Sequence, residues 1–308
     1  MNNRFSQIIY PQVNYNSELI QTVIYLADVK DKTRQNIGNR FYCEENDRRF
    51  ENYRDHAAVS ATRKLIRNMN FNYTRPHKAA VRFNELLCGN DELTEWAKQI
   101  RQFEDDTDYR SFFSSLSDYF DRILTDVRSC PLNDWKKYVE NYFRSVSDLH
   151  LIICPLDGNY GFIVDGISYV VHCTPYYDGN KEIPFAASAL AKSIAHEYAH
   201  CFVNPVVEAN QSLIETHSAF FNKHTNMPGC YNVDYAVMNE YWVRAFAIRF
   251  MEQTGFQDFD VDEEYERQRQ TFIFIDDFVD ALKRYERANV SFEKYYKSNI
   301  SELLNSIK

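Results

Sequence analysis

The stretch SALAKSIAHEYAHCFVNP, residues 188–205, combines a helical pattern of apolar residues with two histidines and a glutamate. An apolar residue recurs at every fourth position, at Leu190, Ile194, Tyr198 and Phe202. This spacing predicts an α-helix with one buried face, and the alanines between these positions let neighbouring elements approach closely. We expect the helix to start near Pro184 and to end at about Val203, because Pro205 cannot continue a regular helix.

His196 and His200 stand four residues apart and therefore lie one turn apart on the same face of this helix. Two imidazoles placed in this way can bind one zinc ion. Glu197 lies one step further around the helix, where a carboxylate can take a proton from a zinc-bound water. The pattern H-E-x-x-H on a helix is typical of zinc hydrolases. The alternative is two half-buried histidines on an ordinary core helix.

A hydrolytic zinc site needs a third protein ligand and leaves the fourth position to water. The downstream candidates are Glu208, Glu215, His217, His224 and Glu240. We favour Glu240, because it stands in the otherwise apolar helical pattern VMNEYWVRAFAIRF, where a buried carboxylate without a partner is costly. Its alternative partner is Arg244, one turn further on, and the two roles can coexist. Glu208 follows the expected helix end too closely to fold back easily.

The bulk composition restricts the class of protein. The chain has 308 residues, of which 44% are apolar, and a formal net charge of −9. This charge argues against a broad nucleic-acid or anionic-membrane surface. No apolar run approaches the roughly 20 residues that span a bilayer. The N-terminal residues lack the apolar core of a signal peptide, so we expect a cytoplasmic protein, or a periplasmic or secreted one if a signal was removed. The oligomeric state is left open.

The pattern along the chain predicts an α+β protein that is predominantly α-helical. Residues 1–147 read as a mainly helical region packed against the core, and residues 148–308 as the region that carries the H-E-x-x-H helix; the two could also form one continuous domain. A small mixed sheet is expected just before that helix. It includes a hairpin around Asp165-Gly166, a pair that suits a type I′ turn. Two later helices are expected at 208–224 and 234–253, the second ending at Gly255.

With these motifs in view, the chain resembles the gluzincin type of zinc metallopeptidase, which has H-E-x-x-H on one helix and Asn-Glu on a later one. More specifically, it resembles a bacterial family of uncharacterised zinc peptidases that is described only as a domain of unknown function. The resemblance rests on VNYNSELIQTVIYLADV, FENYRDHAAVSATRKL, HEYAHCFVNP and NEYWVRA.

The resemblance implies a zincin-like catalytic core with one zinc ion per chain. It implies His196, His200 and Glu240 as ligands and Glu197 as the general base, acting on a peptide or protein substrate. The chain departs from the thermolysin-like pattern at one position, where Arg244 replaces an aspartate. Which residue supports the histidine ligands therefore stays open.

The expected function is zinc-dependent hydrolysis of peptide bonds, in which Glu197 moves the proton of a zinc-activated water. A further donor should stabilise the oxyanion, and Tyr231, Tyr235 and His217 are the candidates. The alternative is a non-catalytic protein that binds a peptide or another polymer and retains a zinc-peptidase fold. An intact Glu197 argues against this alternative, because a structural zinc site needs no base at that position.

Overall fold

The structure is a computed structural model, which describes residues 9–27, 39–69, 71, 74–173, 177–178, 181–182, 185–223 and 233–307. Helices predominate in these ranges, and four strands form a small mixed sheet. The predicted class, α+β and predominantly helical, is therefore confirmed, whereas its zincin-like character stays a prediction. The chain divides into two compact units, unit 1 and unit 2, which are considered separately below.

Unit 2 contains the described parts of Ile9–Cys130 and His150–Phe185. Its helical elements are α1 (Tyr15–Leu26), α2 (Arg40–Phe50), η1 (Glu51–Tyr53), α3 (Ala57–Met69), α4 (Thr74–Val81), α5 (Phe83–Leu86), α6 (Glu92–Thr107), α7 (Tyr109–Ser115) and α8 (Ser117–Arg128). Its strands are β1 (Pro11–Val13), β2 (Leu149–Ile153), β3 (Tyr160–Val164), β4 (Ile167–His172), β5 (Tyr177–Asp178) and β6 (Lys181–Glu182). The four-stranded sheet has the order β1-β2-β4-β3, with β1 parallel to β2 and β3 antiparallel to β4, and β5 and β6 form a separate pair.

The β3–β4 connection is the predicted hairpin. Asp165 and Gly166 have φ angles of 51° and 79°, so both central turn residues are left-handed, as a type I′ turn requires. Val164 pairs with Ile167 across the turn. The Asp-Gly pair therefore sets the register of these two strands, as predicted.

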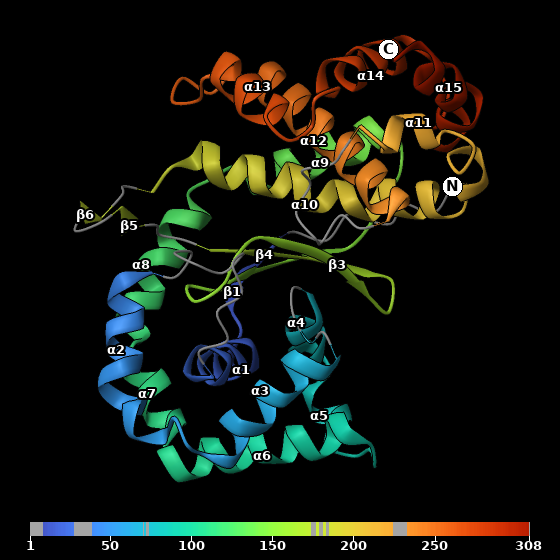
Figure 1. Ribbon diagram of the computed structural model, residues 1–308. Coiled ribbons are helices and arrows are strands. Elements are labelled where there is room, and N and C mark those ends of the chain that lie inside the picture. The colour runs from blue at the N-terminus through green and yellow to red at the C-terminus, as the bar shows by residue number, and fades with distance from the viewer. Residues whose placement is uncertain are drawn as a thin grey trace, which may run out of the picture. The chain divides into compact units, whose positions relative to one another are not determined.

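Unit 1 contains the described parts of Pro131–Leu149 and Ala186–Lys308. Its helical elements are α9 (Leu132–Phe143), α10 (Ala187–Glu208), η2 (Gln211–Leu213), α11 (Ser218–Phe221), α12 (Asp234–Thr254), α13 (Val261–Arg269), α14 (Ile275–Arg287) and α15 (Phe292–Ser306). Helix α10 packs most extensively on α12, and the two lie side by side in Figure 1 in yellow and orange. Helix α9 packs on α10, while α13 and α14 pack on α12.

The core of unit 1 is largely aromatic. Trp242 of α12 contacts Phe278 of α14 and Phe292 of α15, with ring centroids 5.1 and 5.4 Å apart. On α10, Leu190, Ile194 and Tyr198 are fully buried, in agreement with the predicted apolar face. Phe202 completes this face by stacking on Phe143 of α9, with ring centroids 5.3 Å apart. These contacts fix α10 between its neighbours.

The predicted end of α10 at Val203 is wrong, because the helix continues through Pro205 to Glu208. Proline lacks the N–H that would bond to the carbonyl of Cys201, but it leaves the other hydrogen bonds of the helix possible. The amide of Ala209 donates to the carbonyl of Pro205 over 3.1 Å. Since Val203 and Val207 are both fully buried, packing holds the last turn despite the lost bond.

The predicted helix at 208–224 is also wrong over its described part. In its place the chain forms the 3-10 turn η2 and the short helix α11. The side-chain amide of Asn210 donates to the carbonyl of Val206 over 2.6 Å, a local hydrogen bond to the backbone that competes with a continuous helix. The predicted helix at 234–253 is confirmed as α12, and Gly255 caps it in the left-handed conformation with φ of 66°.

The two units differ from the predicted division at residue 147. Residues 150–185, which include most of the sheet, group with the N-terminal helices in unit 2, whereas α9 groups with the H-E-x-x-H helix in unit 1. None of the helices within the described ranges is both long enough and apolar enough to cross a membrane.

Candidate metal centre

Helix α10 presents His196 and His200 from one face. Their ring centroids are 5.0 Å apart, and the ring planes are inclined by 81°. Both side chains are largely buried, with exposed fractions of 17% and 15%. The pairing follows directly from the four-residue spacing on a helix, so the structure places these two residues as predicted.

Helix α12 brings Glu240 against both imidazoles. The Nε2 atom of His200 lies 3.5 Å from Oε1 of Glu240, and Nε2 of His196 lies 3.7 Å from Oε2. In a tetrahedral zinc site with ordinary bond lengths, neighbouring ligand atoms are about 3.3 to 3.5 Å apart. The two imidazoles and this carboxylate are therefore spaced so that they could share one metal ion after small adjustments.

Glu197 lies in the same cluster. One ligand atom from each of His196, Glu197 and His200 can be chosen so that all three lie within 4.8 Å of one another. Glu197 is 9% exposed, so its carboxylate lies at the margin of the buried region. Glu240 approaches the imidazoles more closely than this limit. Two carboxylates, those of Glu197 and Glu240, therefore lie close enough to the imidazoles to be candidate groups of a metal site.

The charges in the cluster are strongly coupled. Burial, the largest influence, lowers the pKa of His196 well below its usual value. Burial also lowers the pKa of His200, but the hydrogen bond and charge of Glu240 outweigh it and raise this pKa to about 9. Burial raises the pKa of Glu240, but the charge of Arg244 and the two histidines outweigh it and hold this pKa well below its usual range. Without a metal, the cluster is therefore an anionic Glu240 beside a protonated His200 and a neutral His196.

Two further residues orient His200 and Glu240. Nδ1 of His200 lies 2.9 Å from Oδ1 of Asn204, one turn further along α10, which leaves Nε2 facing Glu240. Nε of Arg244 donates to Oε2 of Glu240 over 2.8 Å. The Glu240–Arg244 pair weighed as an alternative is thus present together with the contacts to the histidines. Asn204 was not predicted, although its four-residue spacing from His200 could have indicated it.

The other ligand candidates within the described residues lie apart from this cluster. Glu208 is exposed at the end of α10, two turns beyond His200, and Glu215 is exposed after η2. Among the described residues, His217 makes no hydrogen bond or ring contact with His196 or His200. Its Nδ1 atom lies 3.2 Å from the hydroxyl of Thr216. His224 and the oxyanion candidate Tyr231 lie outside the described residues.

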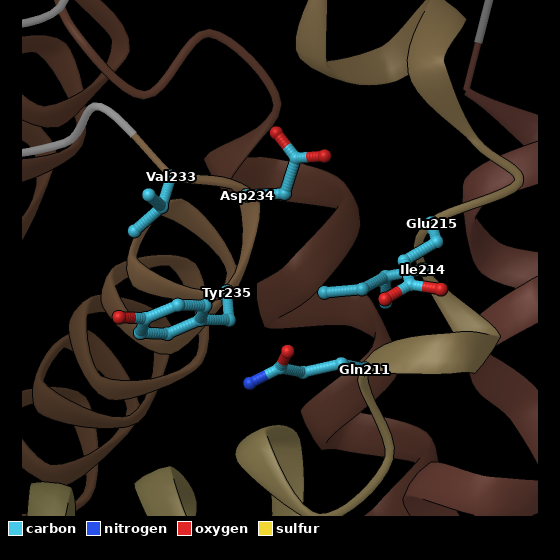
Figure 2. Close-up of a pocket in the computed structure, with 6 residues that line it drawn as sticks. All are labelled: Gln211, Ile214, Glu215, Val233, Asp234 and Tyr235. Carbon is cyan, nitrogen blue, oxygen red and sulfur yellow. The ribbon is translucent and has the colours of Figure 1, made fainter.

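A separate cavity of about 350 Å³ lies between the η2 segment and the start of α12. It is lined by Gln211, Ile214, Glu215, Val233, Asp234 and Tyr235, which Figure 2 shows as sticks. Burial and the charge of Glu215 raise the pKa of Asp234. The oxyanion candidate Tyr235 is therefore part of this cavity, five residues before Glu240 on α12. Neither Glu240 nor either imidazole belongs to the lining.

These features define an α+β protein, predominantly helical, with a histidine–glutamate cluster able to hold a metal ion. A family model described as "Domain of unknown function (DUF4932)" matches residues 79–303, so the chain belongs to this family. The matched segment contains both α10 and α12, and with them every candidate ligand in the cluster. No curated protein and no solved structure matches the chain.

Proposed function

We propose that this protein is a zinc-dependent metallopeptidase of the gluzincin type. One observation carries the proposal: the Glu240 carboxylate meets Nε2 of both His196 and His200, at 3.7 and 3.5 Å, with Glu197 in the same cluster. Three ligands from two helices leave the fourth position of a tetrahedral ion to water, which is the arrangement of catalytic zinc sites. One zinc ion per chain is expected.

When bound there, zinc would lower the pKa of a water molecule and polarise a scissile carbonyl. Glu197 is the residue placed to take the proton from that water and to pass it to the leaving amine. Glu240 and the two imidazoles would hold the ion, and Asn204 fixes the ring of His200. Tyr231, Tyr235 and His217 stay the candidates for a donor to the oxyanion.

The substrate class proposed is a peptide or protein. The second candidate function is a binding protein that retains this fold without catalysis. The position of Glu197 favours the enzyme, because a structural site needs ligands but no adjacent base. The net charge of −9 also gives no support for nucleic acid as the partner.

The decisive experiment compares Glu197→Gln with the parent protein at equal zinc occupancy. The glutamine keeps the size of the side chain but removes its basicity. We expect about one zinc per chain in both proteins and a loss of turnover of about 10² to 10⁴-fold in the variant. Turnover is measured on peptides found in a mixed-peptide screen run with and without a chelator.

Glu208→Gln is the matched control, since Glu208 lies on the same helix but is exposed and remote from the histidines. It should retain parental turnover. Unchanged turnover in Glu197→Gln would show that Glu197 is not the base. A zinc-loaded parent that cleaves no peptide in the screen would favour the binding protein instead.

A further inference from the structure

A series of hydrogen bonds connects Glu240 on α12, through α13, to Lys192 on α10. Nε of Arg244 donates to Oε2 of Glu240 over 2.8 Å, and its Nη1 donates to Oε1 of Gln268 over 3.1 Å. Nε2 of Gln268 then donates to Oε1 of Glu264 over 2.7 Å. Finally, Nζ of Lys192 donates to Oε2 of Glu264 over 2.9 Å.

Lys192 stands one turn before His196 on α10, so the series is closed. The hydrogen bonds run from Lys192 on α10 through α13 to Arg244 and Glu240 on α12. The contact of Glu240 with the imidazoles then leads back to α10. We call these four residues, Arg244, Gln268, Glu264 and Lys192, the polar ring. The ring joins the helix that carries the histidines to the helix that carries the third ligand.

The polar ring is held mostly away from solvent. Gln268 and Glu264 are only 5% and 7% exposed. The guanidinium carbon of Arg244 lies 4.4 Å from the centroid of the Phe272 ring, so its plane is supported from one side. A guanidinium that is stacked and bonded at two of its nitrogens has little rotational freedom, unlike the single ammonium of a lysine.

We propose that Arg244 is a positioning residue that makes Glu240 a metal ligand through one oxygen only, Oε1. This inference rests on the metal centre of the proposed function. Arg244 donates to Oε2 of the carboxylate over 2.8 Å, closer than the 3.7 Å between this oxygen and Nε2 of His196, while Oε1 is the oxygen nearest to His200. A carboxylate can bind a metal through one or both oxygens, so a donor fixed on Oε2 selects the first mode. The polar ring fixes that donor relative to α10.

One-oxygen binding has a chemical consequence at the proposed site. With one oxygen from Glu240 and one nitrogen from each imidazole, the site would supply three protein ligands and leave one position for water. Without Arg244, the carboxylate is free to turn and to add Oε2 as a further ligand. The ion would then be five-coordinate, and its affinity for the site would fall because the ligand is no longer held in place.

The test uses cobalt(II) as the probe, because its visible absorption weakens when a four-coordinate site becomes five-coordinate. The full-length parent protein is freed of metal with a chelator and titrated with cobalt(II), and zinc affinity is measured by competition. In Arg244→Gln we expect a weaker cobalt band and zinc binding that is about 10- to 100-fold weaker. A parental spectrum and affinity in this variant would overturn the inference.

Arg249→Gln is the matched control. Arg249 lies on the same helix and makes a similar two-bond pair with Glu286, over 2.8 and 2.7 Å. Its partners, Glu286 and Glu252, belong neither to the polar ring nor to the cluster. It should keep the parental cobalt spectrum and zinc affinity. A change equal to that of Arg244→Gln would show a general loosening of unit 1 and would also overturn the inference.

Arg244→Lys covers the case in which Arg244→Gln does not fold. The lysine keeps the charge but cannot bond to Glu240 and Gln268 at the same time. We expect a weakened cobalt band here too, and a parental band would overturn the inference. A parent that binds neither cobalt nor zinc would overturn the metal centre itself. If the parent protein binds metal but cleaves no peptide, the peptidase proposal is refuted, while the inference about Arg244 still stands.

Discussion

The charge of Glu240 is balanced from two directions, by Arg244 on its own helix and by the protonated His200 of α10. The sequence favoured this residue because a lone carboxylate in an apolar helix is costly to bury. Arg244 alone would satisfy that argument. The contacts with both histidines, at 3.5 and 3.7 Å, are what distinguish a candidate ligand from an ordinary ion pair.

We therefore predict that Glu240→Gln weakens zinc binding by at least about 100-fold, because even residues that only support a ligand account for 10- to 100-fold. Glu215→Gln and Glu208→Gln, both at exposed positions outside the cluster, should bind zinc like the parent. Dissociation constants from competition with a chromogenic chelator provide the measurement. Parental affinity in Glu240→Gln would mean that the third ligand lies elsewhere, and the gluzincin assignment would fail.

The proton on His200 leads to a second prediction. A histidine binds zinc only in its neutral form, and the pKa of His200 is raised to about 9 in the metal-free protein. Below that pH a proton must leave before zinc binds. Zinc affinity should therefore rise about tenfold per pH unit from pH 7 towards pH 9 and then level off. A titration series that is flat above pH 7 would contradict the coupling between His200 and Glu240.

At the scale of elements, α10 is anchored by a buried polar group on the side of the helix that faces away from His196 and His200. The hydroxyl of Tyr198 lies 3.0 Å from Oε1 of Glu140 on α9 and 2.8 Å from the carbonyl of Ser147. Lys136 donates to the same Glu140 oxygen over 2.5 Å. Since Lys136 and Glu140 are nearly inaccessible, at 1% and 5%, the group is satisfied internally and ties α10 to α9.

We predict that Tyr198→Phe lowers the free energy of unfolding by about 1 to 2 kcal/mol, the net value of a buried hydrogen bond, while Lys136 still compensates Glu140. The control is Tyr296→Phe. Tyr296 is equally buried, but its hydroxyl has no hydrogen-bond partner among the described residues. Its removal should be neutral or stabilising. Urea unfolding of both variants gives the comparison, and equal losses would refute the anchoring role of Tyr198.

At the scale of the whole molecule, the candidate metal centre belongs to unit 1, whereas a completely buried acid with a raised pKa belongs to unit 2. Glu18 on α1 is completely buried. Burial raises its pKa to about 7, although the Cys154 thiol and the Tyr42 hydroxyl beside it act in the opposite direction. Within the described part of the chain, neither the thiol nor the hydroxyl forms a hydrogen bond with the carboxyl oxygens of Glu18. The folded state therefore favours a protonated Glu18.

This burial predicts the pH dependence of stability. The folded chain keeps the Glu18 proton up to about pH 7, while the unfolded chain releases it near the ordinary value of 4.5. Stability from this group is thus complete below pH 4.5 and is lost as the pH rises towards 7, by about 3 kcal/mol. Glu18→Gln should remove this slope, as measured by urea unfolding between pH 4.5 and 8.

Glu104→Gln is the control of opposite sign in the same unit. Burial raises the pKa of Glu104, but the hydrogen bonds from Arg101 and Tyr15 outweigh it and lower this pKa. The ionised Glu104 therefore stabilises the fold at neutral pH, and this stabilisation is lost in acid. The glutamine variant should be less stable than the parent at pH 7. A parental pH slope in Glu18→Gln would show that the carboxyl is ionised in the folded protein.

The sequence by itself determined the features that depend on local backbone geometry. The four-residue spacing of His196 and His200 places them on one helical face whatever surrounds the helix. Asp165-Gly166 adopts the left-handed conformation that its hairpin needs, and Gly255 ends α12 for the same steric reason. The α+β class also followed from the change of hydrophobic period along the chain.

Tertiary structure alone decided the features that depend on contacts between distant residues. The local effect of Pro205 predicted that α10 ends at Val203. The helix instead continues to Glu208, because its last turn is stabilised by the burial of Val207. Spacing along the chain could not show that Arg244 is tied to Gln268 on another helix. The spacing also could not show which candidate ligand lies close to the histidines. Glu240 is 40 positions from His200 and comes near it only because α12 packs on α10. Packing between helices sums many weak apolar contacts, and these are not encoded at any single position.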